Sequence, residues 1–303
     1  MNILVTGGAG FIGSHLTEKL LDDGHQVVIL DNLSTGNLEN LKKCNRNPRL
    51  HTVEGSVLEE DLVASLVEKS DIIYHLAASV GVAWVVEHLS ETLENNVRGT
   101  ENIIKHAQRC GGKKVVIAST SEVYGKSSDI PYREDGDLVL GPTSVGRWGY
   151  ACSKILDELL ALAYYKEHNL PVVILRLFNT VGPRQSGRYG MVLPRFVSQA
   201  LQGMPITVHG DGNQSRCFTY VGDAVTAMVD ISGSPKAEGQ VFNLGSEREI
   251  TINQLASKVV ETLQSNSPIV HVPYESVFGL DFEDIHRRVP DISKIQRYID
   301  FQP

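Results

Sequence analysis

The chain has 303 residues, with 28 Lys and Arg against 36 Asp and Glu, so its formal net charge is −8. At roughly 100–200 residues per domain, this length predicts two domains or one large α/β unit. Hydrophobic residues make up 42% of the chain, which excludes a disordered protein. The acidic balance argues against partners such as nucleic acid or an anionic membrane, because both require basic patches.

No segment is expected to cross a membrane or to act as a secretion signal. The longest nearly apolar run, 72–86, is shorter than the ~20 residues that a bilayer requires. Met1 leads directly into an apolar, strand-like segment without a basic leader. The four cysteines are scattered and form no CxxC pair, so neither a metal site nor a disulfide scaffold is expected. These features predict a cytoplasmic protein.

Short apolar runs alternate with helix-like segments through the first half of the chain. Uninterrupted apolar strands with helices between them indicate a parallel sheet that is covered on both faces. This pattern predicts the α/β class, with a Rossmann-type doubly wound sheet. The predicted strands are 3–5, 27–30, 72–76, 115–118 and 172–175, and the predicted helices are 13–21, 91–109 and 150–168.

The texture of the sequence changes after about Arg176, where Gly and Pro become frequent. We expect a smaller, loop-rich region that closes over the carboxyl edge of the sheet. A strand-like run at 241–244 indicates that this region is interleaved with the sheet. The predicted division is therefore an N-terminal sheet domain at 1–175, with a later contribution near 218–248, and a substrate-binding region at 176–303.

Three glycines, Gly7, Gly10 and Gly13, lie between the first predicted strand and the first predicted helix. Glycines at this junction let the backbone turn tightly and approach a pyrophosphate, which binds at the helix N-terminus. Asp31 ends the next predicted strand, and a carboxylate there accepts hydrogen bonds from ribose hydroxyls and repels a 2′-phosphate. The segment predicts a dinucleotide site that prefers NAD to NADP.

Tyr150 and Lys154 stand four residues apart on a predicted helix, so both lie on one face. A free tyrosine has a pKa of ~10, and a neighbouring ammonium favours its phenolate, which can act as a base. The spacing alone would also fit an exposed surface pair. However, Thr120, Ser121 and Glu122 follow the strand at 115–118, at the sheet edge where ligands bind in this fold class. Hydroxyls there can hold a substrate alcohol, and Glu122 can act as an acid or a base.

Together these segments resemble the extended short-chain dehydrogenase/reductase family that modifies nucleotide sugars. The resemblance runs nearly end to end and departs at Gly55-Ser56, where the family commonly has Gly-Asp facing the adenine. The matching segments are TGGAGFIG (6–13), DNLSTG (31–36), HLAA (75–78), NVRGT (96–100), STSEVYG (119–125), YxxxK (150–154), RLFNTVGPRQ (176–185), GDGNQSRCFTYV (210–221) and RRVPDISK (287–294).

The resemblance implies an NAD-dependent enzyme in which Tyr150 takes a proton from the sugar 4-hydroxyl while the hydride at C4 passes to NAD⁺. The implied catalytic residues are Thr120, Glu122, Tyr150 and Lys154, and no metal is implied. The implied cofactor-binding residues are Gly7, Gly10, Phe11, Ile12, Gly13, Asp31, Asn32, Ser34, Leu76, Ala77, Ala78, Asn96, Tyr150 and Lys154.

The resulting 4-keto sugar can be epimerised, dehydrated or decarboxylated. Glu122 within STSEVYG, and a GP…RW.Y segment at 141–150, resemble UDP-glucuronate decarboxylases. We therefore predict a UDP-glucuronate decarboxylase that forms UDP-xylose. The alternatives are a UDP-sugar 4-epimerase, then an NDP-sugar 4,6-dehydratase, and lastly a catalytically silent NAD-binding scaffold.

The resemblance also implies the contacts of the nucleotide sugar and the oligomeric state. Arg216 and Arg288 suit bidentate recognition of a diphosphate, and the full set of substrate-binding residues is Ser121, Asn179, Arg216 and Arg288. The helices at 91–109 and 150–168 are expected to pair with their copies in a homodimer. Alternatively, their apolar residues belong entirely to the internal core.

Overall fold

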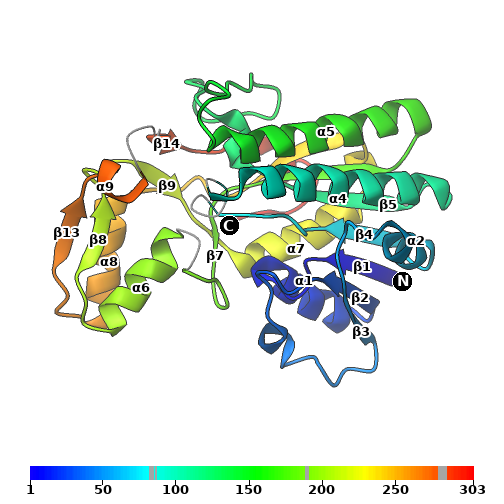
Figure 1. The fold of residues 1–303 in the computed structure, drawn as a ribbon, viewed down its shortest axis with the longest axis horizontal. Coiled ribbons are helices and arrows are strands. Elements are labelled where there is room, and N and C mark those ends of the chain that lie inside the picture. The colour runs from blue at the N-terminus through cyan, green and yellow to red at the C-terminus, as the bar shows by residue number, and fades with distance from the viewer. Residues whose placement is uncertain (82–84, 86, 188–190, 279–284) are drawn as a thin grey trace.

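A seven-stranded parallel sheet forms the centre of the molecule in the computed structural model, which describes residues 1–81, 85, 87–187, 191–278 and 285–303 (Figure 1). Most of the strands are rich in Val, Ile and Leu and are buried on both faces, as the sequence predicted. The edge strand Leu50–Glu54 is partly exposed and was not predicted. In sheet order they are β11 (Gln240–Leu244), β6 (Val172–Leu177), β5 (Lys114–Thr120), β4 (Ile72–His75), β1 (Asn2–Thr6), β2 (Gln26–Asp31) and β3 (Leu50–Glu54).

Helices cover the two faces of this sheet. On one face, α1 (Phe11–Asp22) and α7 (Val221–Ser232) pack together around residues such as Leu16 and Met228. On the other face lie α2 (Glu60–Glu68), α4 (Leu89–Arg109) and α5 (Trp148–His168), and the last two run side by side (Figure 1). The strand order and the two helical layers confirm the doubly wound Rossmann-type fold.

The second part of the chain returns to the sheet before it builds its own cluster. The strand predicted at 241–244 is β11, which pairs with β6, and α7 covers the same sheet. Beyond the sheet, α6 (Val192–Leu201) and α8 (Ile252–Leu263) pack on β8 (Ile206–His209) and β13 (Ile269–Val272), as Figure 1 shows. The loop-rich prediction did not include these two helices, each of which buries an apolar face against the small sheet.

Several short elements connect these layers near the carboxyl edge of the sheet. They are the strands β7 (Thr180–Val181), β9 (Ser215–Cys217), β10 (Thr219–Tyr220), β12 (Glu249–Thr251) and β14 (Arg287–Arg288), the helices α9 (Glu275–Phe278) and α10 (Ser293–Gln296), and the 3₁₀ helices η1 (Leu38–Leu41), η2 (Ser121–Tyr124) and η3 (Pro235–Ala237).

The described residues also bear on membranes, metals and cysteines. None of the helices in the described part of the chain has both the length and the apolarity needed to cross a membrane. Within the same residues, no cluster of three metal-ligating side chains occurs. All four cysteines are free thiols.

Candidate active site

The first strand leads into a turn built from glycines. Gly7 has a φ of +70°, a conformation that favours glycine, and its carbonyl oxygen accepts a hydrogen bond from the N–H of Gly10 at 3.1 Å. A Cβ on Gly13 would lie 2.1 Å from the same oxygen, so this position cannot carry a side chain without a change in the turn. The turn exposes backbone N–H groups at the N-terminus of α1, which is the arrangement that binds a pyrophosphate.

Asp31 ends β2 directly beside this turn. Its Oδ2 accepts a hydrogen bond from the N–H of Ala9 at 2.9 Å, and its Oδ1 accepts one from the N–H of Leu33 at 2.8 Å. A Cβ on Gly36 would lie 2.6 Å from Oδ1, so the following loop closes tightly over the carboxylate. Two backbone donors therefore fix the acidic group that the sequence assigned to the ribose, and the residues present fit NAD.

A cavity of about 520 Å³ extends along the carboxyl edge of the sheet, from the glycine turn into the second part of the chain. It brings together almost every residue that the sequence nominated for the site. The predicted residues that line it are Gly7, Gly10, Phe11, Ile12, Gly13, Asp31, Asn32, Ser34, Leu76, Ala77, Ala78, Thr120, Ser121, Glu122, Tyr150, Asn179, Arg216 and Arg288.

Two of the predicted site residues, Asn96 and Lys154, lie behind the cavity wall instead. The side chain of Asn96 is buried, accepts a hydrogen bond from the N–H of Ser79 at 2.8 Å and donates one to Ser153 Oγ at 3.1 Å. It braces the loop after β4, while its neighbour Asn95 lines the cavity. Lys154 is buried as well, and its ammonium donates to Asp157 Oδ2 at 2.8 Å.

Tyr150 reaches the cavity from the first turn of α5 and contacts Thr120 at the end of β5. Burial raises the pKa of Tyr150, and the negative charges of Glu122 and Asp157 raise it further. The hydrogen bond with Thr120 opposes these effects by lowering the pKa of the same phenol. Without an added positive charge, Tyr150 is therefore a phenol at neutral pH.

Glu122 lies between two arginines at the start of η2. Arg288 Nη1 lies 2.8 Å from Glu122 Oε1, and Arg147 Nη2 donates to Glu122 Oε2 at 3.2 Å. Burial alone would raise the pKa of Glu122, but Arg288 and Arg147 outweigh it and lower the pKa from 4.5 to about 2. Glu122 is therefore a carboxylate at neutral pH and does not begin the reaction as a proton donor.

The remaining predicted substrate residues lie on the far wall of the cavity. The side-chain amide of Asn179 donates to the carbonyl oxygen of Cys217 at 2.9 Å, which ties the segment after β6 to β9. Arg216 lies on β9, and its Nη1 donates to the carbonyl oxygen of Ser215 at 2.7 Å. Arg216 and Arg288 line the same cavity but stand in different surroundings, because only Arg288 is paired with Glu122.

Sequence reasoning missed several lining residues from the second part of the chain. Arg195 Nη1 lies 2.6 Å from His209 Nε2, and Gln214 donates to the hydroxyl of Tyr274 at 2.7 Å. Burial, together with Arg195, lowers the pKa of His209 to about 4, so its ring is neutral at pH 7. Gln214 lies within a recognised segment, whereas no spacing signal marks Arg195 or Tyr274.

The fold and site define an α/β protein with a dinucleotide turn, a tyrosine at the sheet edge and a cavity lined by charged side chains. The chain belongs to the NAD dependent epimerase/dehydratase family, whose pattern it matches over residues 3–245. The cofactor is accordingly NAD, as the sequence predicted.

Three relatives illustrate the range of this family. The chain is 44% identical to a UDP-N-acetyl-alpha-D-glucosaminuronate decarboxylase from Bacillus cytotoxicus, over 99% of this chain and 92% of that protein. It is 36% identical to UDP-glucuronic acid decarboxylase 1 of Arabidopsis thaliana, over 100% of this chain and 66% of the plant protein. The solved UDP-N-acetylglucosamine 4-epimerase from Methanobrevibacter ruminantium M1 superimposes with a TM-score of 0.89 at 32% identity, over 100% of this chain and 92% of that one.

Proposed function

We propose that the protein decarboxylates a UDP-linked uronate through a 4-keto intermediate, with UDP-glucuronate as the substrate and UDP-xylose as the product. The observation that carries the proposal is the cluster of Arg147, Glu122 and Arg288 beside Tyr150. The guanidinium groups of Arg147 and Arg288 converge on the carboxylate of Glu122 at the end of β5. Guanidinium groups suit the recognition of a carboxylate, which the sugar of a uronate carries and the sugar of a simple 4-epimerase substrate lacks.

The residues of the site divide the chemistry between them. When bound, NAD⁺ would accept the hydride from C4 of the sugar and later return it. Thr120 would hold the 4-oxygen, and Tyr150 would take the 4-hydroxyl proton, helped by positive charge that favours the phenolate. Once C4 is a ketone, the C5–C6 bond breaks, CO₂ leaves, and the electron pair delocalises into the enolate. C5 is then reprotonated, and Tyr150 returns its proton to the 4-oxygen.

The two arginines predicted to bind diphosphate take different roles in this proposal. Arg288 is paired with Glu122 and lies 3.4 Å from the Ser121 hydroxyl, so it would face the reacting part of the sugar. Arg216, which lines the far wall of the cavity from β9, would contact the diphosphate. In the same division, residues 1–175 with 218–248 would bind NAD, and the rest of 176–303 would bind the sugar nucleotide.

A second uronate deserves a direct comparison, since a relative at 44% identity is named for UDP-N-acetylglucosaminuronate. We would incubate the protein with NAD⁺ and each of the two uronates, and identify the products by mass. Loss of one CO₂ from UDP-glucuronate supports the proposal, and the ratio of kcat/KM values ranks the two sugars.

Other products would assign other activities on the same fold. An isomer of unchanged mass from UDP-glucose or UDP-glucuronate would identify a 4-epimerase, which the likeness to a solved 4-epimerase favours as the second candidate. Loss of water would identify a dehydratase, and no turnover with any sugar nucleotide would favour the scaffold.

We also propose that the protein is a cytoplasmic homodimer that pairs through α4 and α5. Three side chains on one stripe of α5 are exposed, namely Cys152, Leu156 and Leu159, and Leu159 is 60% exposed. Apolar side chains along one helical stripe suit an antiparallel pairing with a second copy. The unpaired cysteines suit a reducing compartment. Light scattering at micromolar concentration tests the dimer, which a monomeric mass would exclude.

A further inference from the structure

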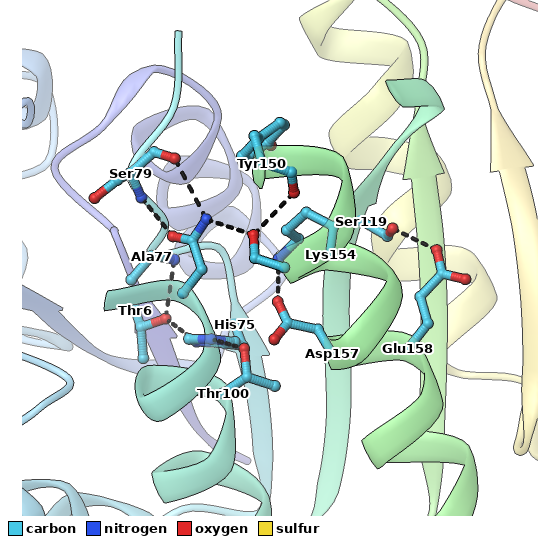
Figure 2. A network of polar contacts seen from close by, with 12 residues as sticks. Thr6, His75, Ala77, Ser79, Thr100, Ser119, Tyr150, Lys154, Asp157 and Glu158 are labelled. Atoms are coloured by element: carbon cyan, nitrogen blue, oxygen red, sulfur yellow. Dashed lines mark hydrogen bonds and ion pairs between the residues drawn. The ribbon is translucent and has the colours of Figure 1, made fainter. Parts of the chain in front are cut away.

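Lys154 is almost completely buried behind Tyr150 and does not line the cavity. Its ammonium donates to Asp157 Oδ2 at 2.8 Å, and the two side chains are 2% and 1% exposed (Figure 2). Removing a charged group from water is costly unless an opposite charge compensates it. Each member of this pair therefore depends on the other.

Asp157 is the ionisable neighbour that pairs with the Lys154 ammonium, because the other ionisable groups nearby are neutral or bound to other partners. His75 lies on β4 close to Lys154, but burial and the Lys154 charge lower its pKa to about 3, so its ring is neutral. Glu158, the next residue of α5, is engaged by Arg176 Nη2 at 2.7 Å and by the Ser119 hydroxyl. Figure 2 shows these two carboxylates side by side on α5, each directed to a different partner.

A line of buried contacts links this pair to the cofactor turn. Thr6, which precedes the glycine turn, meets His75 Nδ1 at 2.8 Å through its hydroxyl, and His75 Nε2 meets the Thr100 hydroxyl at 3.1 Å (Figure 2). Burial raises the pKa of Asp157, while Lys154 and then Thr100 oppose that rise and favour the ionised form. The second oxygen of Asp157, Oδ1, is buried and has no hydrogen-bond partner among the described residues. The carboxylate is thus held mainly by Lys154, between β4, α4 and α5.

We propose that Asp157 is a positioning residue for the reaction, which holds the Lys154 ammonium behind Tyr150 and thereby sets the pH range in which the Tyr150–Lys154 pair works. The inference rests on the proposed function only in taking Tyr150 as the base. In this proposal Asp157 does not contact the substrate and influences the reaction only through Lys154.

The sign of the effect follows from the charges that face the pair. Asp157 on α5 and Glu122 on η2 carry the negative charges that act on Tyr150, His75 on β4 is neutral, and Glu158 on α5 is paired with Arg176. A negative charge raises the proton affinity of every group near it, so Asp157 raises the pKa of Tyr150, after burial and Glu122. Removing that charge lowers the proton affinity of Tyr150. The acid limb of the pH–rate profile, which reports Tyr150 as the base, should then move to lower pH.

The test compares kcat as a function of pH for the wild type, Asp157→Asn and Glu158→Gln. Asp157→Asn keeps the shape of the side chain and removes its charge, and it should move the acid limb down by about one pH unit. Glu158→Gln removes the neighbouring buried charge of the same helix and should leave the acid limb in place, although it weakens the fold. An acid limb that stays fixed or rises in a folded Asp157→Asn enzyme would overturn the proposal. An equal displacement in Glu158→Gln would overturn it too, because any buried charge on α5 would then suffice.

A stability measurement keeps the proposal testable if Asp157→Asn folds poorly. In the double variant Lys154→Met with Asp157→Asn, neither charge is left alone, so urea unfolding should show a higher stability than in Asp157→Asn. A double variant no more stable than Asp157→Asn would show that Asp157 supports the fold without Lys154, against the proposal. An inactive wild type would contradict the proposed function alone, since the stability comparison needs no substrate.

Discussion

The two ends of the cavity are built by different means. At the cofactor end, consecutive residues between Gly7 and Gly13 shape the backbone, and Asp31 is the one acidic side chain that closes it. At the sugar end, Glu122, Arg147 and Arg288 come from three distant segments and hold one another by charge. In the proposed function, the cofactor end would recognise its ligand by shape, whereas the sugar end would recognise it through charged side chains that meet only in the folded chain.

The largest effect should come from the residue that stands between the two ends. Tyr150→Phe removes the phenol that takes the proton and leaves the cofactor end untouched. Turnover should fall by ~10³-fold or more, the upper range of one acid–base contribution. Binding of NAD, followed by fluorescence titration, should stay unchanged. A near-normal rate of CO₂ release in this variant would move the base to another residue.

At the sugar end, Glu122→Gln should lower turnover by ~10²-fold without weakening NAD binding. The amide leaves Arg147 and Arg288 without their shared carboxylate, so both guanidinium groups become free to misplace the substrate. The control is Glu249→Gln, which breaks an equally close ion pair at Arg287, beside Arg288, on the surface. Steady-state assays should find the control at wild-type rates. A similar loss of turnover in both variants would mean that breaking any ion pair in this part of the chain impairs the enzyme, and that Glu122 has no specific role.

The difference between the two ends also explains what the sequence could predict. Several features of the site are local patterns, which can be recognised in the sequence without a structure. They are the glycine turn, Asp31 and the pair Tyr150 and Lys154. Six of the seven strands of the central sheet were predictable for the same reason, because strands buried on both faces are continuous apolar runs. The seventh, the edge strand β3, is partly exposed and has no such run.

What could not be predicted depends on tertiary contacts. Arg195 carries no spacing signal, and it enters the site because α6 lies there. Arg147 stands in the GP…RW.Y segment, but nothing in that segment indicates its ion pair with Glu122. Lys154 was predicted to contact the cofactor, but nothing in YxxxK indicates that Asp157 would take its ammonium. Asn96 was placed in the site by resemblance, and the structure directs its amide to Ser79 and Ser153.

A smaller effect is expected at the cofactor end, on the choice between two cofactors. Asp31→Ser should reduce the preference for NAD over NADP by about ten-fold, the scale of one charge-assisted hydrogen bond. The change is limited because the glycine turn still binds the pyrophosphate. Titration with both cofactors measures the ratio. If wild-type protein bound NADP⁺ as tightly as NAD⁺, Asp31 would not be the selecting residue.

The smallest effect concerns stability, and it separates the ion pairs of the sugar end from its chemistry. The pKa of Glu122 falls from 4.5 to about 2 on folding, so the folded state binds this proton less readily than the unfolded state. Its contribution to stability is therefore complete above about pH 4.5 and disappears as the pH falls towards 2. Urea unfolding of the wild type and Glu122→Gln should give a gap in unfolding free energy that is constant between pH 7 and 5. The gap should narrow steadily below that range, because protonation gives the wild type the same neutral side chain as the variant.

The control is again Glu249→Gln, which removes a surface ion pair with Arg287. For this variant the gap in unfolding free energy should be small at every pH, since exposed ion pairs contribute little. A gap for Glu122→Gln that is unchanged at pH 3 would mean that the two arginines do not hold Glu122 as a carboxylate, and the role proposed for these ion pairs at the sugar end would fail with it.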